Sequence, residues 1–398
     1  MPLVNWRPPR PDPRLAGAPP EFHGGPGYER DVEYPSVTAD LSTNVNPYLP
    51  DEAVRRAVAG APLDAYPDPA SSGARARVAG VWGLDAERIL LAPGASDLIY
   101  RIARCWIRPG DPAVVCGPTF GEYRRAVAVQ GGEVHEVRGV APGFRLPLER
   151  FCDRVARLRP PVAFLCTPNN PTGEALSDAS VAQLADQMPA GTLLAIDESY
   201  RSFAEGRLAP PHLPHDDRVL HLRSFTKDLG VPGLRLAAAV AAPGILHPLA
   251  CVAPPWSVSS VAQAALRTAL APRALAGLED SLIRIAARRR SLSAALARRG
   301  WRPGPSATGF ILAAVPDAAA TTHALRLRGV RVRHAASFGL PGHIRVAVRR
   351  RAEEERFLAA LDEIAASDEI ATPDEIATPD EIAAPDGIAA HTTAGGPS

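Results

Sequence analysis

The chain has 398 residues, of which 46% are hydrophobic, and a formal net charge of +1 at pH 7. This length accommodates two domains with a large core, and the balanced charge argues against nucleic acid or an anionic membrane as the main partner. The five cysteines show no C-x-x-C spacing, and neither a secretory signal nor a membrane-spanning run is apparent, so we expect a soluble cytoplasmic protein without a metal site.

The N-terminal part carries several turn motifs. Residues 1–21 are rich in proline and arginine, and we expect them to be disordered. The His23-Gly24-Gly25 segment that follows is either a linker or a backbone nest for an anion. Residues 40–47 read as a short strand that ends in a turn, and a helix is predicted at about 51–59. Tyr66 precedes a proline, which favours an extended backbone at that tyrosine.

From residue 89 to 240 the chain alternates apolar strands, polar loops and helical stretches. This rhythm predicts a mainly parallel sheet with helices on both faces, in which ligands bind at the carboxyl ends of the strands. The predicted strands are 89–92, 113–116, 162–166, 192–196 and 219–222.

The loop after the first of these strands contains Gly94, Ala95 and Ser96, directly before a helical pattern at 98–106. A glycine turn that leads into a helix N-terminus offers free amides and a favourable dipole to an anion. We therefore expect these three residues to bind a phosphate, and Asp97 to cap the helix.

Lys227 is the only lysine of the chain, in which every other basic residue among the Lys and Arg is arginine. A GC-rich coding bias would explain the arginines, but not why one lysine persists. Arginine stays protonated and cannot form an imine, whereas a desolvated lysine can attack a carbonyl. Ser224, Thr226 and Arg235 lie nearby and suit a phosphate monoester. An aldehyde that carries a phosphate is pyridoxal 5'-phosphate (PLP), which is held by a lysine imine.

The segment from Ser224 to Arg235 resembles the lysine segment of fold-type I PLP-dependent enzymes, the class I/II aminotransferase superfamily. The Pro-Asn-Asn-Pro-Thr-Gly turn that contains Asn170 and the Asp-Glu-Ser-Tyr turn after 192–196 fit the same family. The resemblance implies an α/β fold, with a mainly parallel seven-stranded sheet in a large domain, a smaller α+β C-terminal domain and a homodimer. It also implies a division into an N-terminal arm (22–60), a large PLP-binding domain (61–250) and a small domain (251–366).

The resemblance assigns roles around the cofactor. Asp197 would keep the pyridine nitrogen protonated, which makes the ring an electron sink. Asn170 and Tyr200 would hydrogen-bond the phenolic oxygen, and Phe120 would stack on the ring. Tyr66 would reach across the dimer to the phosphate of the partner's cofactor.

The C-terminal part predicts a long helix at about 261–299 and strands at 309–315, 330–333 and around Arg345. In the family an arginine at the position of Arg345 clamps the substrate carboxylate. Arg333 lies upstream on the same predicted sheet and would bind a second anion. Residues 367–398 repeat Asp-Glu-Ile-Ala with interspersed prolines, so we expect a disordered tail without a catalytic role.

Two subfamilies fit, and they differ in the reaction. Several stretches resemble L-threonine-O-3-phosphate decarboxylase of cobalamin synthesis, in which His23, Gly24, Gly25, Asn44 and Arg333 would hold a substrate phosphate beside Asn170. On this basis decarboxylation of a phosphorylated amino acid is our first expectation. The alternative is an aminotransferase that resembles histidinol-phosphate aminotransferase, and a third reading is a PLP-fold binding protein without turnover.

Overall fold

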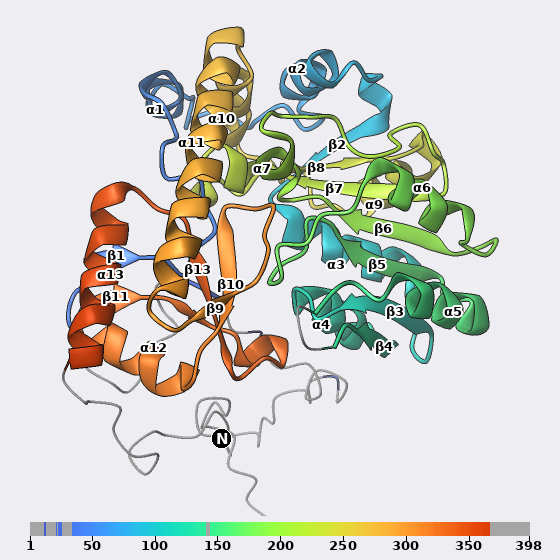
Figure 1. Cartoon of the computed structure of the whole chain (residues 1–398). Helices are drawn as coiled ribbons and strands as arrows, with labels where there is room; N and C mark the ends of the chain where they lie inside the picture. The colour runs from blue at the N-terminus through green and yellow to red at the C-terminus, as the bar shows by residue number, and fades with distance from the viewer. Residues whose placement is uncertain (1–11, 13–20, 22, 26–33, 141–143, 367–398) are drawn as a thin grey trace, which may run out of the picture.

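The computed structural model describes residues 12, 21, 23–25, 34–140 and 144–366, which form two principal sheets with their helices (Figure 1). The expectations for residues 1–21 and for the tail at 367–398 fall almost wholly outside the described residues. No helix of the described part combines the length and the apolar character needed to cross a membrane.

The larger sheet has seven strands in the order β2-β8-β7-β6-β5-β3-β4. The neighbours from β7 to β4 pair in parallel, whereas β8 is antiparallel to both β2 and β7. This confirms the predicted mainly parallel sheet. The strands are β2 (Ile89–Ala92), β3 (Pro112–Gly117), β4 (Glu133–Arg138), β5 (Val162–Cys166), β6 (Leu193–Asp197), β7 (Val219–Ser224) and β8 (Ala237–Val240).

Helices cover both faces of this sheet, which is why its central strands are apolar along their whole length. On β5, Val162 and Phe164 pack with residues of α3 (Ala95–Trp106), α4 (Glu122–Val129) and α9 (Pro243–Cys251). Ala163 and Leu165 of the same strand pack on the opposite side, with α5 (Leu148–Leu158) and α6 (Asp178–Asp186). The alternation follows from the two-residue period of a strand.

The smaller sheet is antiparallel and has the order β12-β13-β10-β9. Beside it, β1 pairs in parallel with β11, so the N-terminal segment adds to this half of the molecule. The elements are β1 (Ala39–Asp40), β9 (Arg302–Pro303), β10 (Phe310–Ala314), α12 (Ala318–Leu327), β11 (Val330–Arg331), β12 (Arg333–His334), β13 (His343–Ala347) and α13 (Arg351–Ala366).

The remaining elements surround the junction of the two halves. They are α1 (Glu52–Ala59), α2 (Ser72–Trp82), α7 (Arg201–Glu205), α8 (Phe225–Asp228), α10 (Ser260–Ala269), α11 (Pro272–Ala297) and short 3-10 turns at Ala86–Arg88, Pro232–Leu234 and Ala336–Phe338. The predicted helix at 51–59 is confirmed as α1, and the side chain of Asp51 caps it by accepting from Val54 N at 2.8 Å.

Two expected elements differ from the structure. The long helix predicted at 261–299 is two helices, α10 and α11, because Pro272 occupies the first turn of the second helix, where its fixed φ and missing N–H favour a new start. The strand predicted at 330–333 divides between two sheets, since β11 pairs with β1 while β12 pairs with β13.

Candidate functional site

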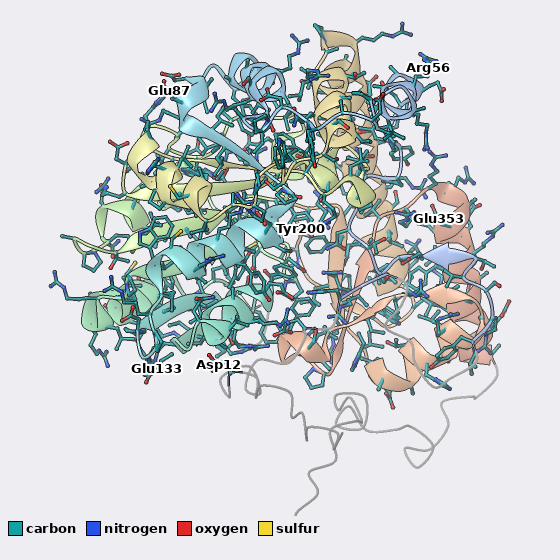
Figure 2. All side chains as sticks on the ribbon, turned by 180° about the vertical axis from the view of Figure 1, so that it is seen from behind. Asp12, Arg56, Glu87, Glu133, Tyr200 and Glu353 are labelled. Atoms are coloured by element: carbon teal, nitrogen blue, oxygen red, sulfur yellow. The ribbon has the colours of Figure 1, made fainter. Side chains whose placement is uncertain are left out.

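The predicted site residues meet where the strands of the larger sheet end. Asp197 is the last residue of β6 and lies in register with Cys166 of β5 and Leu222 of β7. Parallel neighbours end at the same edge, so the loops that follow these strands come together. Figure 2 shows Tyr200, three residues after Asp197, near the centre of the molecule, where the two halves meet.

Lys227 lies in α8, directly after β7. Burial, together with the nearby cations Arg235 and Arg345, lowers the pKa of its amine to about 8. The lysine carbonyl accepts from the backbone N–H of Asn46 at 3.0 Å. A substantial fraction of the amine is therefore neutral near physiological pH, which is the form that attacks a carbonyl.

Asp197 is a buried carboxylate with two internal donors. Its Oδ1 accepts from the backbone N–H of Ser199 at 2.9 Å, and its Oδ2 accepts from the phenol of Tyr123 at 2.7 Å. Burial raises the pKa of Asp197, while the hydrogen bonds from Ser199 and Tyr123 lower it. The structure thus places a carboxylate in a low-dielectric environment, where its ionised form would interact strongly with a cation.

The predicted phosphate ligands are close together. Gly94 precedes α3 with φ of +99°, and a Cβ at this position would lie 2.6 Å from Nη2 of Arg235, so only glycine fits without displacing the guanidinium. The hydroxyls of Ser224 and Thr226 are 2.8 Å apart. The capping role predicted for Asp97 is wrong, because Gly94 takes the cap position and Asp97 pairs with Arg101 at 2.6 Å.

Arg345 projects from the smaller sheet into the same region. Its Nη1 donates to Oδ1 of Asn170 at 2.6 Å, and its Nη2 donates to the carbonyl of Ser42 at 2.8 Å. Among the described residues its Nε has no hydrogen-bond partner. Burial lowers the pKa of Arg345 to about 10, so it is still a cation at neutral pH. A buried cation with a remaining donor is suited to an anion.

Arg333 lies directly opposite Arg345 in the antiparallel pairing of β12 with β13, as the sequence predicted for one sheet. Both side chains are buried, and the ring of Phe338 lies 5.3 Å from the Arg333 guanidinium and 5.8 Å from that of Arg345. Arg333 also donates to Ser337 Oγ at 2.6 Å. The two guanidinium groups on these neighbouring strands thus lie near the same aromatic ring.

The N-terminal segment contacts both parts of the site. Nδ2 of Asn44 donates to the phenolic oxygen of Tyr200 at 3.1 Å, and Oδ1 of Asn44 lacks a partner among the described residues. Burial raises the pKa of Tyr200 to about 12, so its phenol stays protonated. Asn44 and Tyr200, which lie far apart in the sequence, therefore share one polar cluster.

The His23-Gly24-Gly25 segment lies beside the loop that contains Phe120. The His23 ring is 5.4 Å from the Phe120 ring, and its Nε2 is 2.8 Å from Oε1 of Glu122. Gly24 packs so closely that a Cβ would lie 2.3 Å from the carbonyl oxygen of Ser42. The amide of Gly25 donates to Oγ of Ser42 at 3.0 Å, so in this structure it is engaged with protein.

Tyr66 lies on the surface, with 79% of its side chain exposed. It stacks on Trp256, whose ring centroid is 4.4 Å away at an interplanar angle of 24°. Within one chain Tyr66 is therefore placed as part of an exposed aromatic pair, a position from which it can contact another molecule.

Two polar residues of the site were not assigned roles from the sequence. Tyr123 follows Phe120 by three residues, a spacing that places both on one side of a helical turn, and this was the available signal. Asn46 donates from Nδ2 to the Asp228 carbonyl at 3.1 Å and to Ser281 Oγ at 2.7 Å. It thereby joins the lysine loop to α11, a link that no local pattern indicates.

Glu198, the neighbour of Asp197, belongs to a separate buried cluster. Its Oε1 lies 2.5 Å from Nδ1 of His212 and 3.1 Å from Nδ1 of His221. Burial alone would raise the pKa of Glu198, but the two histidines outweigh it and hold that pKa well below its usual range. The Glu198 side chain therefore anchors the 206–217 loop through His212.

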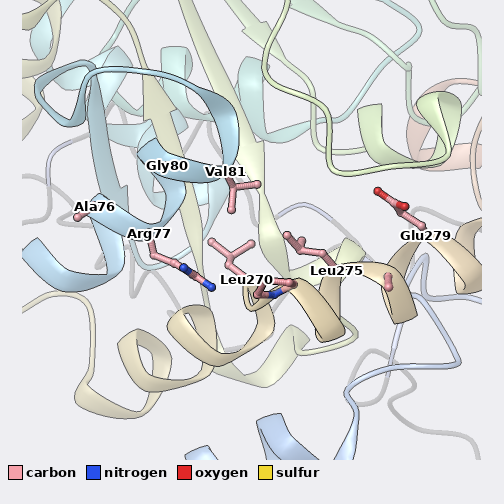
Figure 3. Close-up of a pocket in the computed structure, with 9 residues that line it drawn as sticks. Ala76, Arg77, Gly80, Val81, Leu270, Leu275 and Glu279 are labelled. Atoms are coloured by element: carbon pink, nitrogen blue, oxygen red, sulfur yellow. The ribbon is translucent and has the colours of Figure 1, made fainter.

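A surface hollow of about 420 Å³ lies elsewhere, between α2 and the start of α11 (Figure 3). Its charged lining residues are Arg77 and Glu279, and the rest is apolar or glycine. None of the predicted site residues lines it, so it is separate from the site around Lys227.

Comparisons with known proteins identify the family to which the chain belongs. A family model described as aminotransferase class I and II matches residues 37–361. The chain is 35% identical over 333 residues to the histidinol-phosphate aminotransferase of Symbiobacterium thermophilum, covering 81% of this chain and 89% of that protein. Among solved structures, histidinol-phosphate aminotransferase from Sinorhizobium meliloti in complex with pyridoxal-5'-phosphate superposes with a TM-score of 0.77 at 26% identity, over 83% of this chain and 92% of that one.

The L-threonine-O-3-phosphate decarboxylase of Porphyromonas gingivalis has the same fold, with a TM-score of 0.71 at 24% identity, over 82% of this chain and 99% of that one. At this level of identity the likeness concerns the fold alone.

The residues around Lys227 fit PLP. The close approach of Gly94 to Arg235 and the paired hydroxyls of Ser224 and Thr226 form a cradle suited to a phosphate, and Asp197 supplies the buried carboxylate that a pyridine nitrogen requires. PLP is accordingly the cofactor, and the fold is that of the fold-type I PLP-dependent enzymes. The chain belongs to the class I and II aminotransferases.

Proposed function

We propose that the protein transfers an amino group between a phosphorylated amine, of the histidinol phosphate type, and a 2-oxoacid. The observation that carries this proposal is the cross-strand pair of Arg333 and Arg345 next to the lysine loop. An aminotransferase receives two different substrates in turn at one site. A pair of buried cations can bind both substrates, because it accepts a phosphate in one half-reaction and carboxylates in the other.

The relatives favour this reaction over decarboxylation. The relatives above 30% identity named here are histidinol-phosphate aminotransferases, from Symbiobacterium thermophilum and from Nicotiana plumbaginifolia, the second 33% identical over 82% of this chain. The decarboxylase is supported by a structural neighbour of lower identity. Amino transfer, which the sequence analysis gave as the alternative, is therefore the first proposal.

In the mechanism, Lys227 acts as the general base. When bound, PLP supplies a conjugated ring that withdraws electrons from the substrate Cα. The Lys227 amine, neutral in part because its pKa lies near 8, would take the proton from the substrate Cα and hold it as an ammonium group until the proton is returned. Asp197 would face the ring nitrogen and, as the ionised carboxylate, would keep it protonated, and Tyr200 would donate from its protonated phenol. Arg345, whose Nε keeps a donor among the described residues, would bind the carboxylate of the amino-acid or 2-oxoacid substrate.

The exposed pair of Tyr66 and Trp256 supports a homodimer in which Tyr66 reaches the partner's phosphate site. Exposed aromatic side chains are enriched where proteins associate. The stacking of the two rings fixes Tyr66 in one orientation, which reduces the entropy cost of a contact across the dimer.

Decarboxylation of O-phospho-L-threonine is the second candidate. It is favoured by the contact of the His23-Gly24-Gly25 segment with Phe120 and Ser42, since this segment is the one that the decarboxylase resemblance assigns to a substrate phosphate.

One pair of assays separates these functions. The purified holoenzyme is incubated with histidinol phosphate and 2-oxoglutarate, and separately with O-phospho-L-threonine without a 2-oxoacid. We expect glutamate to form in the first reaction and no CO2 in the second. Release of CO2 over many turnovers would overturn the proposal in favour of the decarboxylase, and inactivity in both would favour another substrate.

A further inference from the structure

We propose that Tyr123 is a positioning residue, whose phenol holds the Asp197 carboxylate in the orientation and charge state that the cofactor nitrogen requires. The proposal depends on the cofactor and is independent of the substrate. It therefore applies to transamination and to decarboxylation alike.

The position of Tyr123 follows from its place in the chain. The loop after β3 carries Phe120, and Tyr123 comes three residues later in the first turn of α4. Its ring stacks on Phe164 of β5, with centroids 5.4 Å apart and an interplanar angle of 18°, and meets the edge of Phe120 at 5.8 Å. Only 1% of Tyr123 is exposed. These two aromatic contacts fix the Tyr123 ring, and the orientation of the ring in turn fixes the position of the phenolic oxygen.

The Tyr123 phenol is thereby placed against the carboxylate of Asp197. The phenol donates to Oδ2 at 2.7 Å, while the Ser199 amide donates to Oδ1 at 2.9 Å. An ionised carboxylate accepts about four hydrogen bonds, so each oxygen keeps a further site. The two internal donors therefore fix the plane of the carboxylate and still leave lone pairs for a protonated ring nitrogen.

The Tyr123 phenol also affects the protonation state of Asp197. In its buried position Asp197 would favour the neutral acid, because desolvation penalises the anion. A neutral acid would not keep the ring nitrogen protonated. Burial next to Asp197 raises the pKa of Tyr123 well above its usual value, so its phenol remains a donor and does not compete as a base. The same hydrogen bond thus orients the carboxylate and favours its ionised form.

A purely structural reading is that the phenol only satisfies its own hydrogen-bonding need in the core. A double-mutant cycle distinguishes the two readings. Tyr123→Phe removes the hydroxyl and keeps the ring that packs on Phe164. Asp197→Asn removes the charge on which the phenol acts. Tyr100→Phe is the matched control. It also removes a phenol that donates to a buried carboxylate, but the acceptor is Glu122, at 2.8 Å, and not Asp197.

The readouts are the dissociation constant of PLP from the apo protein and the absorption spectrum of the bound cofactor, both without substrate. We expect Tyr123→Phe to weaken PLP binding by about tenfold, the loss typical of a hydrogen bond to a charged group, and to shift the spectrum in the direction of Asp197→Asn. Adding Tyr123→Phe to Asp197→Asn should then change little, and Tyr100→Phe should leave both readouts unchanged.

The proposal is overturned if Tyr123→Phe leaves affinity and spectrum unchanged, or if it costs the same factor with and without the Asp197 charge. Because no substrate is present, failure of this test is distinct from failure of the proposed amino transfer.

Discussion

The site has two halves that are built differently. The proposed cofactor half consists of Gly94, Asp197, Ser224, Lys227 and Arg235, all at or close to strand ends of one sheet. The proposed substrate half consists of Asn44, Asn170, Arg333 and Arg345, which come from the N-terminal segment, a loop of the large sheet and two strands of the small sheet. The first half is held by the pairing of strands in one sheet, whereas the second depends on contacts between segments that are far apart in the chain.

This difference explains why the cofactor could be inferred before the substrate. In the cofactor half each residue sits within a short motif next to a strand, so its chemistry is visible in local sequence. In the substrate half, contacts such as Arg345 with Asn170 and with the Ser42 carbonyl join residues far apart in the chain. The reaction depends on how these contacts orient a substrate.

The largest effect is expected in the cofactor half. Lys227→Ala should lower turnover at least about 10⁴-fold, the upper end of what a general base contributes, and should also remove covalent attachment of the cofactor. Lys227→Arg, which keeps the charge without the nucleophilic amine, should be as inactive. Mass spectrometry after borohydride reduction checks this directly, because the chain has a single lysine. Retention of the cofactor by Lys227→Ala after reduction would refute the assignment.

In the substrate half, the two arginines should separate the two substrates. Arg345→Leu should lower kcat/KM for carboxylate substrates by about a hundredfold or more, as expected for the loss of two hydrogen bonds to a charged group. Arg333→Leu should lower kcat/KM mainly for the phosphorylated substrate. Steady-state kinetics with both substrates measures the difference. Equal losses for both substrates in both variants would show that the arginines act as one structural unit.

The pH dependence of cofactor binding tests whether the halves are coupled. Only the neutral amine of Lys227 reacts, and its pKa is lowered to about 8, so the binding rate of the apo protein should rise with pH and level off above about 8. Since Arg345 contributes to the lowering, Arg345→Leu should move the midpoint to higher pH. Rapid-mixing absorbance on both proteins gives the profiles. An unmoved midpoint would mean that the halves are electrostatically independent.

The same lowered pKa has a consequence for folding. Between about 8 and the usual lysine value the unfolded chain holds the Lys227 proton while the folded chain does not. The contribution of this group to the stability of the apo protein should therefore increase as the pH rises through that interval.

The smallest effect is expected at the link between the halves. Asn46→Ala removes the donors to the Asp228 carbonyl and to Ser281, and should lower the free energy of unfolding by about 1–3 kcal/mol, because it leaves buried acceptors unpaired. Ser281→Ala removes the acceptor on α11 and the hydroxyl's own bond to the Leu278 carbonyl but keeps the Asn46 bond to Asp228, so it should cost less. Urea titration of both variants measures this, and an unchanged midpoint for Asn46→Ala would show that the link is dispensable.

The sequence by itself determined the sheet and the cofactor, and it supplied most of the residues that we propose around the cofactor. Strand periodicity, a glycine turn before α3 and a single lysine are local features whose physical meaning does not depend on distant residues. Two local predictions were wrong. The sequence predicted one helix where Pro272 starts a second, and it assigned to Asp97 the cap position that Gly94 occupies.

Only the tertiary structure decided which side chains meet. The phenol of Tyr123 on Asp197, the bridge from Asn46 to α11 and the register of Arg333 against Arg345 all join segments that are separate in the chain. Such contacts arise from the packing of α4, the N-terminal segment and the small sheet against the large one. Their energies depend on burial and distance, and these quantities exist only once the chain has folded.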